Sequence, residues 1–443
     1  MGLKVKIALF ASIAFSIGAY FSIQHVINPI HVYELIGAYL LAFAAYATFL
    51  NQKVKLNLWH VFVLGLAFRL FMFSWPTLSD DFYRFYWDGK LLAEGTNPYA
   101  TIPKSIFGLE VNNIKVAHKT LYDFLNSKDY FSVYPPFLQY IFGFSALVGN
   151  SLNGFVAVFS ILVLSAEVGT FFLVRKILLI KNLPLKNIAI YWLNPLIVIE
   201  LNGNLHGEVF MILAIAAALY FYNTKKFLIT GLALGLAVLT KLYPILFIPF
   251  FLLPFNKKPA LVILLGVVIS VFALGRPLIN LELAANIFES IQLYYAKFEF
   301  NGSIYNLLKQ IGIKLTGYNQ INLIGKVLGL LTLVGFGVLY FFKVKSPSKF
   351  TIERNIYLGM ILFYLLSTTI MPWYLSIIIF ASVFNKSKVG IVWSALVILT
   401  YSAFSNTHFK EDSALVAVEY YALAAVIIFE LRNYFRQKIF ESN

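Results

Sequence analysis

The sequence predicts an all-α, polytopic membrane protein, and its composition and hydropathy support that prediction. Of the 443 residues, 60% are hydrophobic and 12% are charged, whereas soluble domains carry about a quarter charged residues. The mean hydropathy is +0.78. Apolar runs recur along the whole chain, and about twelve to fourteen of them are expected to form transmembrane helices of a single domain over residues 1–443.

The net charge of +15 does not indicate a nucleic-acid partner. The lysines and arginines fall in short clusters between apolar runs, where the positive-inside rule places them in cytoplasmic loops. A basic groove for nucleic acid would need a soluble face that this chain lacks. The absence of cysteine excludes disulfides and thiolate metal sites.

Three apolar runs are expected before the first long polar segment. They cover residues 7–27, 32–50 and 56–75, and the third ends near Trp75-Pro76. Lysines before the first run and after the second mark the cytoplasm, so the third run leads to the extracytoplasmic side. Residues 76–133 are therefore expected to form a large first extracytoplasmic loop.

The next run, residues 133–149, is short. Tyr134-Pro135-Pro136 predicts a helix start, because proline is tolerated in the first turn of a helix. A run at 154–174 follows and leads to four cations between residues 175 and 186. If both runs crossed the membrane, those cations would lie outside, so we expect 133–149 to cross only partly.

The remaining runs give a consistent charge pattern. They lie at 187–201, 209–222, 227–240, 243–255, 259–276, 322–342, 355–371, 373–384, 389–404 and 414–431. Basic clusters follow alternate runs, so the other breaks face outward. These outward breaks are 202–208, 241–244, 276–320, 371–374 and 405–412, with a second extracytoplasmic loop at 277–320. Most of the unusual polar residues lie in these breaks, which indicates a polar site on that side.

Three carboxylates in one short window after the third run are the strongest sign of function. Asp80, Asp81 and Asp88 lie close to Arg84, and acidic groups at the mouth of a span indicate a functional site. Desolvation and a like-charged neighbour raise a carboxyl pKa, which suits general-base catalysis. Arg84, one helical turn on, could hold one carboxylate ionised. The alternative is that these acids only cap a helix beginning after Ser79.

Aromatic side chains accompany these acids. Tyr83, Tyr86 and Trp87 present flat faces of the kind that stack on sugar rings. The alternative is an interfacial aromatic belt. Tyr243, Trp373 and Tyr374 add further aromatics in the outward breaks.

Two other breaks carry candidate ligands. Asn204, His206 and Glu208 interrupt an apolar region; they either bind a divalent metal or orient a substrate hydroxyl, and two ligands in view leave the metal open. The alternative is a polar kink between short helices. Lys241 and Arg276 lie at outer helix ends, where they either snorkel or bind an anionic phosphate.

Five motifs in order carry a resemblance to a known family. They are SDDFYRFYWDG with GTNPY, VYPPFLQYIF, LNPLIVIELNGNLHGE, KLYP and MPWYL, within residues 56–375. Together they resemble the GT-C superfamily of bacterial membrane glycosyltransferases, closest to family 87 and the polyprenol-phosphate-mannose-dependent mannosyltransferases. Members often show His-x-Asp where this chain has His206-Gly-Glu208.

The resemblance implies a GT-C-like bundle and an inverting transfer of a hexose, with mannose implied by the resemblance alone. The donor is a polyprenyl phosphate sugar, and the acceptor is a glycan or lipid outside the inner (plasma) membrane. Asp80, with Asp81 next, is the implied base, and Lys241, Arg276 and Arg84 are candidates to stabilise the leaving phosphate. The residues expected at the substrates are Arg84, Tyr83, Trp87, Asp88, Asn97, Tyr99, Tyr134, Asn204, His206, Glu208, Lys241, Tyr243, Arg276, Trp373 and Tyr374.

Other functions make different demands on the sequence. A transporter or flippase of a lipid-linked or polar substrate predicts charges buried in mid-span and repeated halves. Here the charges gather at the outer ends of spans, which favours the enzyme. A structural subunit of the cell envelope would not need the acids and cations together. His408, in the last outer loop, is expected to be a solvated loop residue.

Overall fold

Long apolar helices make up most of the protein. The structure is a computed structural model that describes residues 2–25, 31–51, 53–54, 56–73, 78–106, 110–111, 114–115, 119–253, 257–296, 298–405 and 409–442. Within these ranges, six helices are long and apolar enough to cross a membrane. They are α1 (Leu3–His25), α2 (Val32–Leu50), α8 (Leu152–Ile180), α13 (Lys257–Ser270) with its π-helical end η4 (Val271–Gly275), α16 (Ile321–Lys345) and α20 (Ser413–Ser442). The chain is therefore a multi-pass membrane protein.

Shorter apolar helices fill the space between these spans. They are α3 (Leu58–Phe71), α7 (Pro136–Gly149), α11 (Phe227–Thr240), η3 with α12 (Tyr243–Phe247, Ile248–Leu252), η5 with α18 (Pro372–Leu375, Ser376–Ser382) and α19 with η6 (Val389–Leu396, Val397–Ser405). One further pair, η2 (Ile197–Gly203) and α10 (Glu208–Asn223), is bent by 113° and counts as a seventh span if taken together. These short and broken helices, together with the six long ones, correspond to the apolar runs among which about twelve to fourteen transmembrane helices were expected.

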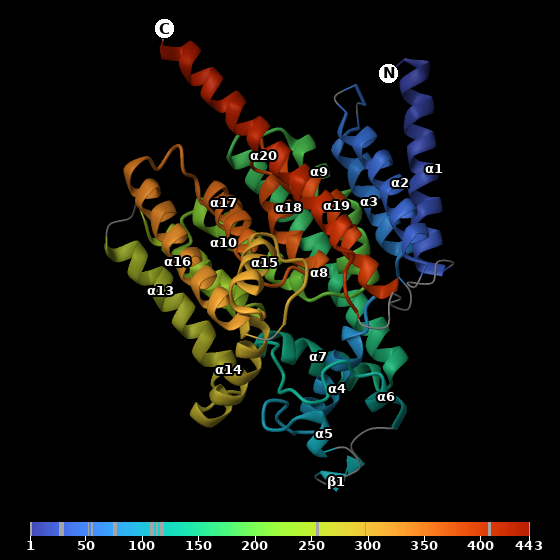
Figure 1. The fold of residues 1–443 in the computed structure, drawn as a ribbon, viewed down its shortest axis with the longest axis vertical. Coiled ribbons are helices and arrows are strands. Elements are labelled where there is room, and N and C mark those ends of the chain that lie inside the picture. The colour runs from blue at the N-terminus through green and yellow to red at the C-terminus, as the bar shows by residue number, and fades with distance from the viewer. Residues whose placement is uncertain are drawn as a thin grey trace.

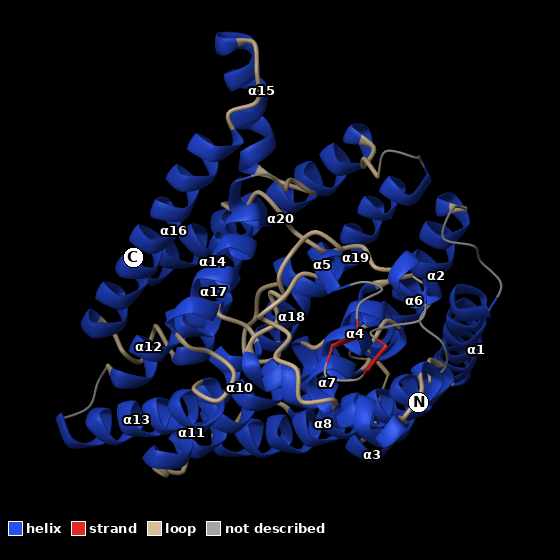
Figure 2. Cartoon of the chain, turned by 90° about the horizontal axis from the view of Figure 1, so that it is seen from below, coloured by secondary structure: helices blue, strands red, loops and turns tan. Residues whose placement is uncertain are grey.

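The remaining elements are mostly at the two ends of the helix body. They are α4 (Asp81–Ala93), α5 (Pro103–Ile106), β1 (Glu110–Val111), β2 (Ile114–Lys115), α6 (Lys119–Asp123), η1 (Leu185–Ile188), α9 (Ala189–Trp192), α14 (Leu281–Ala296), α15 (Ile304–Thr316) and α17 (Ile352–Leu365). Elements α4 to α6 lie at the end of the body opposite both termini (Figure 1). We call this the loop end. In the view from that side, helices surround a central region of loops, beside which α4 and α5 lie (Figure 2).

Helix α7 belongs to the loop end and is too short to cross. Its 14 residues rise about 21 Å, less than the roughly 30 Å of a bilayer core. It packs on α4 so closely that a Cβ on Gly89 would lie 2.4 Å from the carbonyl oxygen of Phe142. Helix α8 then runs to the opposite end, where Lys181 Nζ lies 2.8 Å from Glu353 Oε1. The cations of residues 175–186 thus lie away from the loop end, as the partial crossing of 133–149 requires.

Helices α11 and α13 are in backbone contact. A Cβ on Gly231 would lie 2.0 Å from the carbonyl oxygen of Ile263, and a Cβ on Gly235 would lie 2.5 Å from Ser270 Cβ. Small residues allow such close approach in membranes. Because the two helices end together, Lys241 and Arg276 lie just past neighbouring helix ends at the same edge of the body.

A buried ion pair ties α3 to α8. Arg69 Nη2 lies 2.5 Å from Glu167 Oε2, and both side chains are fully buried. The guanidinium also donates to the carbonyls of Gly65 and Trp192 and lies 3.7 Å above the Trp192 ring. Tyr191 donates its hydroxyl to the other oxygen of Glu167 at 2.5 Å. The charges are thus matched inside the body, away from the carboxylates of α4.

Candidate active site

Two adjacent carboxylates begin helix α4, and one amide binds both. Asn126 Nδ2 donates to Asp80 Oδ1 at 2.9 Å and to Asp81 Oδ1 at 2.8 Å. Asp80 is exposed, whereas the side chain of Asp81 is 22% exposed. The preceding Trp75-Pro76 lies outside the described residues. The two acids therefore share a donor but differ in their access to water.

The surroundings make Asp81 a weaker acid than an ordinary carboxyl group. Desolvation and, second, the charge of Asp80 raise the pKa of Asp81 to about 6, and the hydrogen bond from Asn126 opposes that shift. Desolvation also raises the pKa of Asp80, again against Asn126. A carboxylate with a raised pKa can accept a proton near neutral pH.

The segment before His206 has an irregular backbone. Residues Ile197–Gly203 form the π-helix η2, a conformation frequent at functional sites. Leu205 then has φ of 61°, which a leucine adopts only at a cost of about 1–3 kcal/mol. This irregular turn brings the His206 side chain to Asp81.

His206 connects three segments of the chain. Its Nδ1 lies 2.8 Å from the carbonyl oxygen of Glu200, and its Nε2 lies 3.9 Å from Asp81 Oδ2. The imidazole stacks on the Trp373 ring with centroids 3.7 Å apart and planes 14° apart. The breaks 202–208 and 371–374, which the charge pattern predicted to face the same side, therefore meet at the start of α4.

Glu200 is a site residue that the sequence analysis did not select. Its carboxylate is fully buried; it accepts from the Tyr401 hydroxyl at 2.7 Å and from Asn204 Nδ2 at 3.1 Å. Asn204 Oδ1 in turn accepts from the backbone of Leu78, two residues before Asp80, at 3.2 Å. The missed signal was one acid inside an apolar run, which itself indicates function in a membrane. The sequence around Asn126 and Tyr401 contains no pattern that would have indicated a site residue.

Lys241 is paired rather than free. Its Nζ lies 2.6 Å from Glu208 Oε1 and 4.9 Å from the centre of the Tyr374 ring. Lys241 and Glu208 both act electrostatically on Asp81. Tyr243 packs its ring on Phe363, with centroids 5.7 Å apart. Lys241, Glu208 and Tyr374 thus form one group beside the carboxylates.

Arg276 lies at the same edge as Lys241 and is available to a ligand. Its side chain is exposed, and within the described residues it has no hydrogen bond or ion pair.

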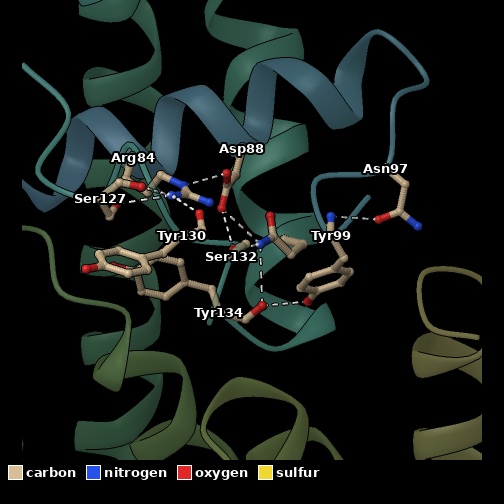
Figure 3. A network of polar contacts seen from close by, with 9 residues as sticks. Arg84, Asp88, Asn97, Tyr99, Ser127, Tyr130, Ser132 and Tyr134 are labelled. Carbon is tan, nitrogen blue, oxygen red and sulfur yellow. Dashed lines mark hydrogen bonds and ion pairs between the residues drawn. The ribbon is translucent and has the colours of Figure 1, made fainter. Parts of the chain in front are cut away.

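Arg84 and Asp88 pair with each other, and their contact with substrate stays a prediction. Arg84 Nε binds Asp88 Oδ1 at 2.8 Å, and both side chains are buried. Arg84 also donates to the carbonyls of Ser127 and Tyr130, while Ser132 donates to Asp88 at 2.5 Å (Figure 3). The guanidinium therefore holds residues 127–130 on α4 instead of pairing with Asp80 or Asp81.

Asn97, Tyr99 and Tyr134 also shape the loop end. Asn97 Oδ1 accepts from the backbone of Tyr99 at 3.0 Å, and its Nδ2 donates to the carbonyl of Leu278 at 2.8 Å. The buried Tyr99 donates its hydroxyl to the carbonyl of Tyr134 at 2.5 Å (Figure 3). The Tyr134 ring packs edge-on against Phe85. These contacts give the GTNPY motif a folding role, and its predicted substrate contacts stay predictions.

The aromatic side chains of α4 are covered by protein. Trp87 is 2% exposed, and the stacking of its face on a sugar stays a prediction. The Tyr83 ring stacks on Phe124, with centroids 4.9 Å apart and planes 11° apart. Tyr86 is also buried. Phe124 and Tyr122 pack against Tyr83 and Trp87, whereas Phe155 of α8 packs against Tyr86.

No metal centre is evident in the part of the chain that the structure describes: no three His, Cys, Asp or Glu side chains there are grouped to hold an ion. His206 and Glu208, the two predicted ligands, have separate partners, Glu200 and Lys241. His408 lies outside the described residues.

Comparison with known protein families places more than half of the chain in one of them. A family model described as alpha-(1->6)-mannopyranosyltransferase, N-terminal domain, matches residues 13–256, which is more than half of the 443 residues. The match covers Asp80, Asp81, His206, Glu208 and Lys241. No curated protein and no solved structure matches the chain.

Proposed function

The chain belongs to the alpha-(1->6)-mannopyranosyltransferase family, and on that premise we propose that this membrane mannosyltransferase takes mannose from a polyprenyl phosphate. The motif resemblance to GT-C enzymes supports that donor. The basic clusters lie in the breaks opposite the loop end, which favours an extracytoplasmic site. The acceptor is a hydroxyl of a glycan or glycolipid on that side.

The base in this proposal is Asp81, ahead of Asp80. The observation that carries it is the convergence of Asn126, His206 and Asp81: one oxygen of Asp81 is bound by Asn126 and the other faces His206. Asp80 has the Asn126 contact and greater exposure to water. The pKa of Asp81, about 6, suits a group that must be ionised at neutral pH yet accept a proton.

Lys241 and Arg276 stabilise the leaving phosphate in this proposal. Both lie at the same edge of the body, and preorganised cations at developing charge lower the barrier. Arg276 is exposed and without a side-chain partner in the described residues. Lys241 is held in place by Glu208.

The transfer is a single displacement at the anomeric carbon. Asp81 takes the proton of the acceptor hydroxyl, and the oxygen forms a bond to that carbon. The bond to the phosphate oxygen breaks, and the polyprenyl phosphate leaves with the electron pair. With inversion, an alpha-linked product requires a beta-linked donor.

The test uses purified enzyme in lipid with radiolabelled polyprenyl phosphate mannose and a mixture of membrane glycolipid acceptors. We expect transfer by the wild type and by Asp80→Asn, and a loss of about 10²–10⁴-fold in Asp81→Asn, after gel filtration shows that both variants fold. Equal transfer by all three would refute the base assignment. No transfer, with movement of the labelled lipid across vesicles, would favour a flippase.

A further inference from the structure

The protonation of His206 is set by its partners. The carbonyl oxygen of Glu200 can only accept, so His206 Nδ1, at 2.8 Å, carries a hydrogen. In the neutral ring, Nε2 then has a lone pair and no hydrogen. His206 is 1% exposed, and Nε2 has no hydrogen-bond partner within the described chain. A buried nitrogen acceptor without a hydrogen-bond donor is rare in folded proteins and calls for an explanation.

The nearest group to that lone pair is also an acceptor. Asp81 Oδ2 lies 3.9 Å from Nε2, too far for a hydrogen bond. Two acceptors facing each other repel, and a single proton between them would turn the repulsion into a charge-assisted hydrogen bond. Catalytic hydrogen bonds are often long in the free enzyme and shorten when substrate binds.

The imidazole is fixed for this contact. Its face is stacked on Trp373 at 3.7 Å, and its Nδ1 side is held by Glu200. Glu200 also places a carboxylate oxygen, Oε2, 3.5 Å from Nδ1. A negative charge there stabilises an imidazolium ion once Nε2 gains a proton.

Burial lowers the pKa of His206 to about 4, so the imidazole is neutral in the free enzyme. Carboxylates nevertheless face the ring: Asp81 Oδ2 and Glu200 Oε2 lie 3.9 Å and 3.5 Å from its nitrogens, and Glu208 acts on it electrostatically. The cation that opposes them among the described residues is Lys241, which is paired with Glu208. The neutral hydroxyl of Tyr401 binds Glu200. A proton taken from the acceptor therefore enters a site that is short of positive charge.

We propose that Asp81 and His206 share the proton removed from the acceptor hydroxyl, and that Glu200 is the positioning residue for His206. This rests on the proposed function. The proton moves from the acceptor oxygen to Asp81 and is shared with His206 Nε2 while the bond to the anomeric carbon forms. It leaves to water after the product departs, which returns His206 to the neutral form.

The experiment measures kcat, the donor KM and the proton inventory in mixed H₂O and D₂O for wild type, His206→Gln and Glu200→Gln. For His206→Gln we expect kcat to fall by about tenfold or more, as for other supporting partners of a catalytic group, with donor KM unchanged. For the wild type, the plot of rate against the D₂O fraction should be curved, because two protons move in the transition state. For His206→Gln the same plot should be linear. A structural defect would lower the rate without changing that shape.

Glu200→Gln keeps an acceptor for Tyr401 and removes the charge. We expect the acid limb of its pH profile to move to lower pH, because the shared site loses a negative neighbour. His60→Gln, an exposed histidine, is the matched control and should behave as wild type. Linear proton inventories in every enzyme, or an unchanged kcat in His206→Gln, would overturn the sharing of the proton between Asp81 and His206. Transfer of mannose by these enzymes would still support the proposed function. A wild type without transfer would overturn both.

Discussion

Lys241 Nζ lies 2.6 Å from Glu208 Oε1, so a cation that acts on Asp81 is already paired with a carboxylate before any donor binds. Glu208 is buried, and a buried charge that loses its partner destabilises a protein strongly. The pair therefore links the stability of the fold to the chemistry of the site.

Lys241→Met should lower both thermal stability and activity. It leaves the carboxylate of Glu208 unpaired; because Lys241 is 25% exposed, the cost should be below the about 3–5 kcal/mol of a fully buried pair. Thermal unfolding in detergent measures this. The double variant Lys241→Met/Glu208→Gln should regain stability but not transfer. Recovery of transfer in the double variant would show that Lys241 does not act on the phosphate.

Arg276→Gln should affect donor binding alone. The side chain is exposed and has no described partner, so the unfolding temperature should stay within measurement error. The donor KM should rise by about tenfold, the loss of roughly one charge-assisted contact with phosphate. Steady-state kinetics with varied donor measure this. An unchanged KM would place the donor phosphate away from this edge.

Asp80→Asn should leave an active enzyme whose acid limb lies at lower pH. Asp81 must be ionised to act as base, so activity falls as the pH drops through its pKa of about 6. Removing the charge of Asp80 removes a cause that raises this pKa. The pH dependence of kcat/KM measures the shift. A shift to higher pH, or loss of all activity, would contradict Asp81 as the base.

Asn126→Ala should move the acid limb of the pH profile to higher pH. The amide donates to Asp81 at 2.8 Å and holds the pKa down, so its loss should raise the pKa and move the limb to higher pH. Lys104→Gln, in an exposed pair with Asp129, is a control on the same loop. Opposite shifts in Asp80→Asn and Asn126→Ala would be difficult to explain by general damage.

Arg69→Met should destabilise the protein without changing the site. It leaves Glu167 buried and unpaired, at a cost of about 3–5 kcal/mol. Thermal unfolding should show a large loss, while kcat per folded molecule and the pH profile should match the wild type. A changed pH profile would mean that this pair acts on the carboxylates.

Charge alone predicted that several polar breaks lie on the same side of the membrane. Alternation of basic clusters placed Asp81, His206, Lys241 and Trp373 on one side, and the structure sets Asp81 beside His206, His206 on Trp373, and Lys241 on the neighbouring Tyr374. Hydropathy predicted the membrane fold, because the hydropathy of a segment depends only on its local sequence.

The sequence could not show what covers α4. Arg84 and Asp88 fall on one helical face, and the periodicity is right, since they pair at i and i+4. Whether that face meets substrate or protein depends on residues 127–132, which fold back over it. Glu200 was missed for a related reason, since its main partner, Tyr401, is 201 positions away.

That separation has a consequence for how the protein is made. Chains are synthesised from the N-terminus, so Glu200 and His206 leave the ribosome long before Trp373 and Tyr401 exist. Until then a carboxylate destined for the interior lacks its hydroxyl partner, and the imidazole lacks its stacking partner. Only a chain that extends past Tyr401 can satisfy these groups. A chain that terminates before Trp373 therefore leaves the carboxylate of Glu200 without the Tyr401 hydroxyl and the imidazole of His206 without its stacking partner.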